Sequence, residues 1–410
     1  MALVPRFGWS PELSRKAVHV GLGLGCLGFP WLFSSPLSVW ILAGLAVAVL
    51  AGLRRLELGK ALHGVERQSL GDLLFPLGVA TVFTTARGDA MAFVIPVGIL
   101  ALADAVGAVG GVRYGRVSYT TWKGTKSVEG SALFFLTAFL LAHLGLLLGT
   151  EETRWTCVLV ALAIALLGMV IEGLLGDGWD NFVLPVGLWL VLDRALERSL
   201  LGQVVSVVFV VALFALVLLL RRSSSLDGGG LLAAVLFGYA CATLGGATFL
   251  WPPLVLFAVH LVTTRAIADR KSLQHGLREI AAVAAPSLVW LLLYELNLVS
   301  YAGALAGHVL ASAVLLGLMH VGTRRFLGLS GVGWNLGLAK PLLGLLLPWL
   351  ALRRFAWDGW LGVIFGLSGL VGAMVVFYRF GWRRAGNGWN WSWKAVAAGG
   401  VSLGAFLLPL

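Results

Sequence analysis

The sequence predicts an all-α, polytopic integral membrane protein, and three observations favour this fold class. Of the 410 residues, 59% are hydrophobic and only 12% are charged, whereas a soluble domain carries roughly 25% charged residues. Apolar runs follow one another from Ala17 to the C-terminus, each close to the ~20 residues that a helix needs to cross a bilayer. These runs do not alternate between apolar and polar residues, as the strands of a membrane β-barrel do.

Each apolar run is interpreted as one spanning helix, because a helix satisfies its backbone polar groups within its own segment. The first run ends in Pro30 and Trp31 and not in a small-residue cleavage site, so we expect a spanning helix there and no cleavable signal peptide. The later runs are separated by gaps of 1 to 18 residues. In chain order, the about 15 predicted spans are residues 17–33, 36–53, 71–86, 89–110, 129–149, 155–173, 181–193, 202–220, 229–249, 251–264, 279–297, 299–320, 335–350, 358–378 and 393–410.

Basic residues gather on one predicted side of the membrane, and this orients the chain. If the N-terminus is cytoplasmic, the opposite side holds few basic residues, namely Arg87, Arg154, Arg194, Arg198, Arg353 and Arg354. Lys340 falls inside a span, and all other Lys and Arg then face the cytoplasm, as the positive-inside rule requires. The rule also accounts for the net charge of +11. Anionic membrane lipids are therefore the expected partners, and nucleic acid is not.

One seam interrupts the chain at residues 221–230 (RRSSSLDGGG), its most loop-like stretch. We therefore predict a catalytic transmembrane domain over residues 1–222 and a second, non-catalytic transmembrane domain over residues 223–410. No gap between spans is long enough for a soluble domain, so any chemistry depends on short loops and on polar residues within the helical bundle. The cysteines lack paired spacing and are interpreted as packing residues: Cys26, Cys157 and Cys241.

Four polar groups in the first domain are candidates for chemistry, because an ionisable residue is costly in or beside a spanning helix. The first group comprises Arg15, Lys16 and His19, whose spacing puts them on one face of a helix. Its alternative interpretation is a basic pair that anchors the helix beside an interfacial histidine. The second group is Asp104 with three glycines at four-residue steps. Helix packing through small residues explains these glycines but not the acid: Gly107, Gly111 and Gly115.

The third group is the basic segment 123–130 (KGTKSVEG), which leads into a helix. Two lysines, Lys123 and Lys126, together with free backbone N–H groups at a helix start, predict an anion site suited to phosphates. Glu129 could face Asp104 across this connection, and the two carboxylates could hold Mg²⁺. The segment is not a Walker A loop, because the pattern G-x-x-x-x-G-K-[ST] is absent from it. Its alternative interpretation is a positive-inside loop with a helix cap.

The fourth group is an acidic turn between two predicted spans, on the face where basic residues otherwise dominate. It contains Glu172, Asp177, Asp180, Asn181 and Pro185. The positive-inside rule does not explain acids at this place. Metal binding or the positioning of a hydroxyl group does, because carboxylate and amide oxygens suit both tasks.

In this order and spacing, the four groups resemble the CTP-dependent polyprenol kinase family, which includes dolichol kinases and phytol kinases. The resemblance covers about residues 10–195, under half of the chain. Each motif is weak alone, but the four stand in the family's order and on one predicted side of the membrane. The matching residues are Arg15, Lys16 and His19, then Asp104, Gly111 and Gly115, then Lys126, Ser127, Glu129 and Gly130, and finally Glu172, Asp180, Asn181 and Pro185.

The resemblance implies a kinase that transfers the terminal phosphate of CTP to a long-chain isoprenoid alcohol of the phytol, geranylgeraniol or polyprenol type. Its cofactor would be Mg²⁺, and it would act at the cytoplasmic face of a membrane, here expected to be a prokaryotic plasma membrane. Nucleotide-binding residues would be Lys123, Lys126, Ser127, Gly111, Gly115, Arg15 and Lys16. Metal ligands would be Asp104, Glu129, Glu172, Asp180 and Asn181. Asp180 with Asn181 would alternatively orient the prenol hydroxyl, and His19 would be a proton acceptor.

Other interpretations stay open at the level of the sequence. A cytidylyltransferase acting on a lipid phosphate could use the same charged groups, and a transporter could have two halves of similar span number. The second half has small-residue runs that resemble the phytyl-phosphate kinase family, but it lacks the aspartate-rich segment of a working member. The sequence leaves open the chain length of the alcohol, the choice of nucleotide and the oligomeric state.

Overall fold

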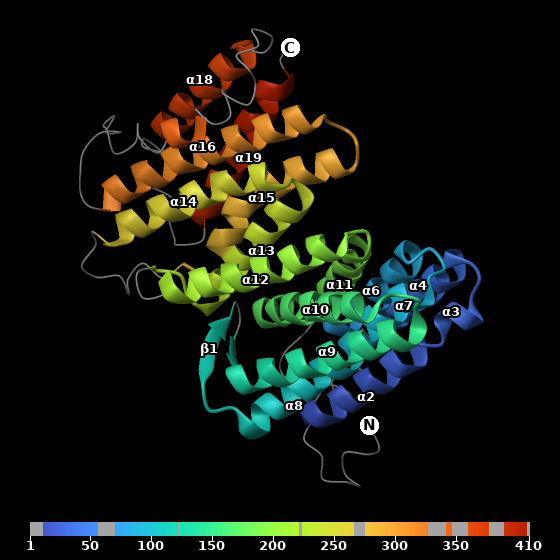
Figure 1. Ribbon diagram of the computed structural model, residues 1–410. Helices are drawn as coiled ribbons and strands as arrows, with labels where there is room; N and C mark the ends of the chain where they lie inside the picture. Colours follow the sequence, from blue (N-terminus) through green and yellow to red (C-terminus); the bar gives the residue numbers. More distant parts are fainter. Residues whose placement is uncertain are drawn as a thin grey trace. The chain divides into compact units, whose positions relative to one another are not determined.

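The computed structural model describes residues 11–55, 70–121, 124–220, 224–265, 275–326, 342–346, 360–376 and 389–407. Nearly all of these residues are α-helical, which confirms the predicted all-α class (Figure 1). Contacts within the chain divide it into two compact units, Met1–Phe214 and Ala215–Leu410. The division falls inside one helix, before the predicted boundary between residues 222 and 223, and that boundary stays a prediction.

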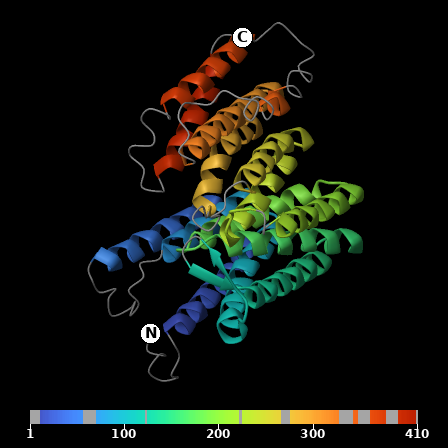
Figure 2. The ribbon, with the colours of Figure 1, turned by 90° about the vertical axis from the view of Figure 1, so that its left-hand side faces the viewer.

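The first unit contains the helices that position the polar groups. In chain order it comprises α2 (Pro11–Cys26), α3 (Phe29–Leu32), α4 (Pro36–Arg55), α6 (Gly71–Thr85), α7 (Ala90–Gly98), the π-helical turn η1 (Ile99–Ala103), α8 (Asp104–Tyr114), β1 (Ser118–Thr121), β2 (Gly124–Ser127), α9 (Val128–Gly149), α10 (Arg154–Leu174), α11 (Asp180–Leu196) and most of α12 (Leu200–Leu220). Helices α9 and α10 run side by side (Figures 1 and 2). Their contact is close because Phe134, which is fully buried, packs against Gly168.

The second unit is a separate helical bundle with its own apolar core. Its helices are α13 (Gly228–Leu244), α14 (Ala247–Arg265), α15 (Leu277–Glu295), α16 (Tyr301–Phe326), α18 (Trp360–Val376) and α19 (Trp389–Leu407). Helix α16 lies at the centre and packs against α14, α15, α18 and α19. Trp290 on α15 is buried, and its indole N–H donates a hydrogen bond to Ser402 Oγ at 3.0 Å. A buried indole is stable here because its one donor is satisfied.

A polytopic membrane protein is consistent with the length and composition of these helices. Within the described ranges, seven helices are long and apolar enough to cross a membrane: Pro36–Leu53, Ala90–Tyr114, Val128–Gly149, Arg154–Leu174, Leu200–Leu220, Leu277–Glu295 and Tyr301–Gly322. The predicted number of about 15 spans and the cytoplasmic N-terminus stay predictions. The predicted span 335–350 lies mostly outside the described residues.

The predicted first span, residues 17–33, is divided between two helices. Helix α2 ends at Cys26, and α3 begins at Phe29 with Pro30 in its first turn. Proline has no N–H to donate, so it is accepted in the first turn of a helix but interrupts a helix interior. The break leaves α2 as a short, separate helix that packs against η1.

Candidate active site

The segment predicted as a loop before α9 is a two-stranded antiparallel ribbon of β1 and β2. Tyrosine and threonine in β1 favour extended backbone, which helps so short a segment to form a strand. Lys126 lies on β2, and its Nζ donates a hydrogen bond to Glu172 Oε1 at 2.6 Å. The same Nζ donates to the backbone carbonyl of Glu172, one of the last carbonyls of α10. Lys126 therefore neutralises a buried carboxylate and also stabilises the C-terminus of a helix.

A second ion pair joins α2 to α8. Lys16 Nζ lies 2.6 Å from Asp104 Oδ2, and only 14% of the lysine side chain and 6% of the aspartate side chain are exposed. His19 Nε2 lies 3.8 Å from the same carboxylate oxygen and 3.3 Å from the Leu100 carbonyl oxygen. Its ring packs edge-on against Phe75 at 5.0 Å between centroids. The first and second predicted groups thus meet in the fold, although Lys16 and Asp104 are 88 residues apart in sequence.

Two local features bring this ion pair together. A Cβ placed on Gly23 would lie 2.4 Å from Ala101 Cβ, so only glycine lets α2 approach η1 this closely. Gly23 lies on the same face of α2 as Lys16 and His19, because the three are spaced by three and four residues. The π-helical turn η1 ends directly before Asp104 and changes the direction in which the following residues point. Such turns inside an α-helix are frequent at functional sites.

The fourth predicted group forms the turn between α10 and α11. Asp177 and Gly178 adopt positive φ angles of 58° and 85°, which reverses the chain sharply. Asn181 then donates a hydrogen bond from Nδ2 to the carbonyl of Gly71 at 2.8 Å and ties the start of α11 to α6. The Oδ1 of Asp180 accepts a hydrogen bond from the Asn181 N–H at 3.1 Å. Within the described residues, Asp180 takes part in no salt bridge.

These contacts assemble one charge cluster from α2, α8, β2, α10 and α11. Its members lie close enough to influence one another's charge: Lys16, His19, Asp104, Lys126, Glu172 and Asp180. Burial, followed by the charge of Asp104, raises the pKa of the Asp180 carboxyl above its ordinary value. The carboxylates of the cluster outnumber its lysines, and each lysine is already paired with a carboxylate. Burial of these charges costs free energy, and clusters of groups with perturbed pKa values are frequent at functional sites.

Two predicted site residues have a different place. Glu129 was expected to face Asp104, but both of its carboxylate oxygens lie 3.3 Å from the backbone nitrogen of Val117, which donates to them. Ser127 is the N-cap of α9, and its Oγ accepts a hydrogen bond from the Gly130 N–H at 3.1 Å. Ser127 stabilises the start of α9 because it satisfies a backbone donor there, and Glu129 ties the first turn of α9 to the backbone just before β1. The helix-cap alternative describes them better than the phosphate and metal roles.

The predicted nucleotide-binding glycines lie in a helix contact. A Cβ on Gly111 would lie 2.8 Å from Ser127 Oγ, and a Cβ on Gly115 would lie 2.7 Å from Ser127 Cβ. Both glycines therefore let α8 and α9 approach each other, as the small-residue alternative predicted. The two remaining predicted residues, the side chain of Arg15 and the whole of Lys123, lie outside the described residues.

Substitution of Gly130 by alanine should destabilise the first unit. A Cβ there would lie 2.8 Å from the carbonyl oxygen of Gly107 and 3.0 Å from the Cα of Gly111, so α8 and α9 would have to separate. Overpacking of this kind costs about 1–3 kcal/mol. Thermal unfolding of the purified protein in detergent measures the effect. Gly21→Ala is the matched control, because a Cβ at Gly21 meets nothing within 4 Å. An equal melting temperature for the two variants would refute the close packing.

A magnesium ion suits the charge cluster only as a partner of a phosphate ligand. Within the described part of the chain, no group of three or more His, Cys, Asp and Glu residues is arranged to hold a metal by itself. Kinases instead hold Mg²⁺ through one or two carboxylates together with the phosphates of the substrate. Asp104 and Asp180 provide such carboxylates, and within the described residues Asp180 forms no salt bridge with a lysine. Glu129 and Asn181 point their polar groups at the backbone of other segments.

Two features of the site were missed by reasoning from the sequence. Tyr119 on β1 stands opposite Lys126, and its hydroxyl oxygen lies 2.8 Å from Ser131 Oγ. Alternation over four residues is too short to predict a strand, so the pairing of Tyr119 with Lys126 could not be predicted from the sequence. The π-helical turn before Asp104 was also unforeseen. Pro96, three residues before the first residue of η1, is the feature of the sequence that could have indicated it, because a proline disturbs the regular helical hydrogen bonds.

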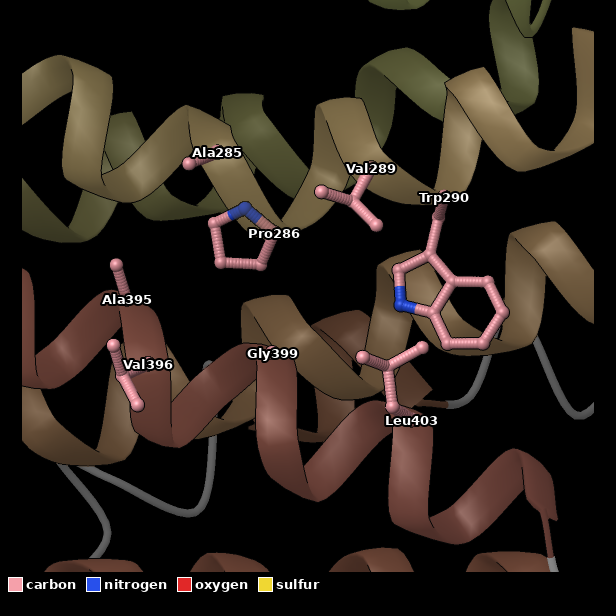
Figure 3. Close-up of a pocket in the computed structure, with 8 residues that line it drawn as sticks. All are labelled: Ala285, Pro286, Val289, Trp290, Ala395, Val396, Gly399 and Leu403. Carbon is pink, nitrogen blue, oxygen red and sulfur yellow. The ribbon is translucent and has the colours of Figure 1, made fainter.

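The second unit contains a pocket of a different kind (Figure 3). Its volume is about 220 Å³, and it lies between α15 and α19, beside Pro286, Trp290 and Leu403. None of the residues that line it is ionisable. Such a pocket has no groups for binding phosphates or moving protons.

Comparison with known proteins gives one informative relative. The phytol kinase of Synechocystis sp. is 31% identical over 191 residues, which covers 45% of this chain and 80% of the relative. No protein-family model matches the chain, and no solved structure matches it.

Proposed function

The chain belongs to the phytol kinase family, and on that premise we propose that the charge cluster transfers the terminal phosphate of CTP to a long-chain isoprenoid alcohol. Family membership makes the protein a membrane-associated kinase of an isoprenoid alcohol. We further propose that the donor is CTP, that the acceptor is phytol, geranylgeraniol or a polyprenol, and that the site lies on the cytoplasmic face.

One observation supports the proposal most strongly, namely that two partly buried lysines meet three carboxylates in one place. Lys126 and Lys16 each hold a carboxylate at 2.6 Å, so the lysine charges are already oriented before any ligand binds. Phosphoryl transfer depends mainly on positioning and on neutralisation of charge. When triphosphate enters, its oxygens can take the place of the carboxylates as partners of the lysines. Pre-oriented charges act strongly in a site that excludes water.

The reaction is an in-line displacement at the terminal phosphorus. The alcohol oxygen forms a bond to that phosphorus while the bond to the bridging oxygen breaks, and CDP leaves. The proton of the alcohol passes to a carboxylate, for which we assign Asp180, with His19 as the other candidate. Asp180 is suited to this role because burial and Asp104 raise its pKa, which makes its carboxylate a better proton acceptor. Mg²⁺ would be held by Asp104 together with the phosphates and would neutralise their charge, which leaves Asp180 unbound by the metal and able to accept the proton.

Labelled nucleotides test this function directly. The purified full-length protein in detergent receives Mg²⁺, phytol, geranylgeraniol or a polyprenol, and CTP labelled at either the γ- or the α-phosphate. We expect γ-label in a prenyl monophosphate and no α-label in any lipid, with ATP and GTP as poorer donors. Alpha-label in a lipid together with released pyrophosphate would instead identify a cytidylyltransferase. No label in any lipid would overturn the kinase proposal.

A further inference from the structure

Tyr119 lies beside the charge cluster and has no role in the function described so far. The register of the ribbon places it directly opposite Lys126. Side chains directly opposite each other in an antiparallel pair leave the same face, with Cβ atoms about 4.5–5.5 Å apart. The tyrosine ring and the alkyl chain of Lys126 therefore share the face from which Lys126 reaches Glu172.

The ring of Tyr119 is fixed at both ends. Its backbone belongs to β1, and its hydroxyl oxygen lies 2.8 Å from Ser131 Oγ in the first turns of α9. Its neighbour Thr120 is exposed on the other face of the ribbon. A ring held in this way forms a rigid wall beside a flexible lysine chain, because tyrosine has few rotatable bonds.

The electrostatic surroundings of Tyr119 agree with this placement. Burial raises the pKa of its phenol, and the negative charge of Glu172 raises it further. The phenol thus stays neutral at physiological pH, and it lies within the influence of the carboxylate that Lys126 holds. It can serve as a wall and as a hydrogen-bonding group, but not as a base.

We propose that Tyr119 is a positioning residue for Lys126: its ring confines the lysine chain, so that the ammonium group stays aimed at Glu172 and, in the nucleotide complex, at a terminal phosphate oxygen. The orientation toward a phosphate oxygen rests on the proposed kinase function. A lysine chain can adopt many conformations, so a wall that limits them prepares the charge for its ligand. A tyrosine that only anchors the ribbon to α9 would leave the lysine's aim unchanged.

Chemical labelling of Lys126 tests whether the Tyr119 ring confines the lysine chain, and this test needs no enzyme activity. Full-length protein is treated with an acetylating reagent for amines, and acetylation of Lys126 is followed by mass spectrometry. We expect Tyr119→Leu to raise the labelling rate by at least about threefold, because the ammonium is released from its buried partner. Tyr119→Phe keeps the ring beside the lysine and loses only the contact with Ser131, so its labelling rate should stay well below that of Tyr119→Leu. Thr120→Val, on the opposite face, is the matched control and should leave the rate unchanged.

Steady-state kinetics test whether Tyr119 also orients Lys126 toward the bound nucleotide. We expect Tyr119→Leu to raise the KM for CTP by about tenfold and Tyr119→Phe to change it by less than about twofold. In a Lys126→Met background, Tyr119→Leu should add nothing, because the residue acts through the lysine. Unchanged labelling in Tyr119→Leu, or an additive loss in the double variant, would overturn the role of Tyr119. Inactivity of the unmodified protein with a raised labelling rate in Tyr119→Leu would instead count against the kinase function alone.

Discussion

Replacement of Lys126 by methionine is expected to lower phosphoryl transfer by about 10²–10³-fold, the usual cost of removing one pre-oriented charge from such a site. Methionine keeps the length of the chain and removes its charge. The lysine is the member of the cluster that contacts two groups of α10, the Glu172 carboxylate and the Glu172 carbonyl. The rate of γ-label transfer from CTP to phytol measures the effect.

A loss of activity alone would not separate catalysis from folding. Removal of one partner of a buried ion pair costs up to about 3–5 kcal/mol, and somewhat less here because 24% of the Lys126 side chain is exposed. The double variant Lys126→Met with Glu172→Gln removes the unpaired charge and should recover thermal stability while staying inactive. Arg113→Met, which removes a positive charge from an exposed position on α8, is the control and should stay active. Activity in the stable double variant would show that the lysine serves the fold only.

Replacement of Asp104 by asparagine should have an effect of similar size, about 10²-fold or more on the transfer rate. The carboxylate is buried beside Lys16 and His19. If it also holds Mg²⁺ with the triphosphate, the variant should need a higher Mg²⁺ concentration for half-maximal activity. Initial rates over a series of Mg²⁺ concentrations measure this shift.

The ion pair with Lys16 offers a second explanation for a loss of activity in Asp104→Asn. One double variant distinguishes this explanation from a role in metal binding. If Asp104 only neutralises Lys16, then Lys16→Met should restore activity to Asp104→Asn, because no unpaired charge remains. If Asp104 takes part in binding the metal and phosphates, the double variant should stay as inactive as the single one. Restored activity with an unchanged Mg²⁺ requirement would contradict the metal assignment made here.

Much of the fold was predictable because a bilayer imposes simple demands on a sequence. Apolar length predicted helices that occur close to the expected residues, such as α9, α10 and α12. The ribbon before α9 was not predicted, because four-residue strands give no reliable alternation. The split between α2 and α3 was signalled by Pro30, but only the contact of α2 with η1 shows what the split achieves.

The charged residues that meet in the cluster were all among those named from the sequence, but their pairing was not predicted. The cost of an ionisable residue near lipid pointed to Asp104, Glu172 and Asp180, whatever the fold. The same reasoning could not tell that Glu129 would accept from the backbone N–H of Val117 while Glu172 would receive Lys126. Both acids stand at the edge of a predicted span, and only the fold buries Glu172 while it leaves Glu129 more exposed.

The helical class and the small set of charged residues that need a partner follow from residue type, because apolar length and the cost of charge near lipid can be read position by position. Which charges meet depends on the packing of the helices. Lys16 reaches Asp104 because Gly23 lets α2 approach η1, and Lys126 reaches Glu172 because a ribbon carries it there. Pairing over such distances in sequence depends on backbone approach and register, which no local pattern encodes.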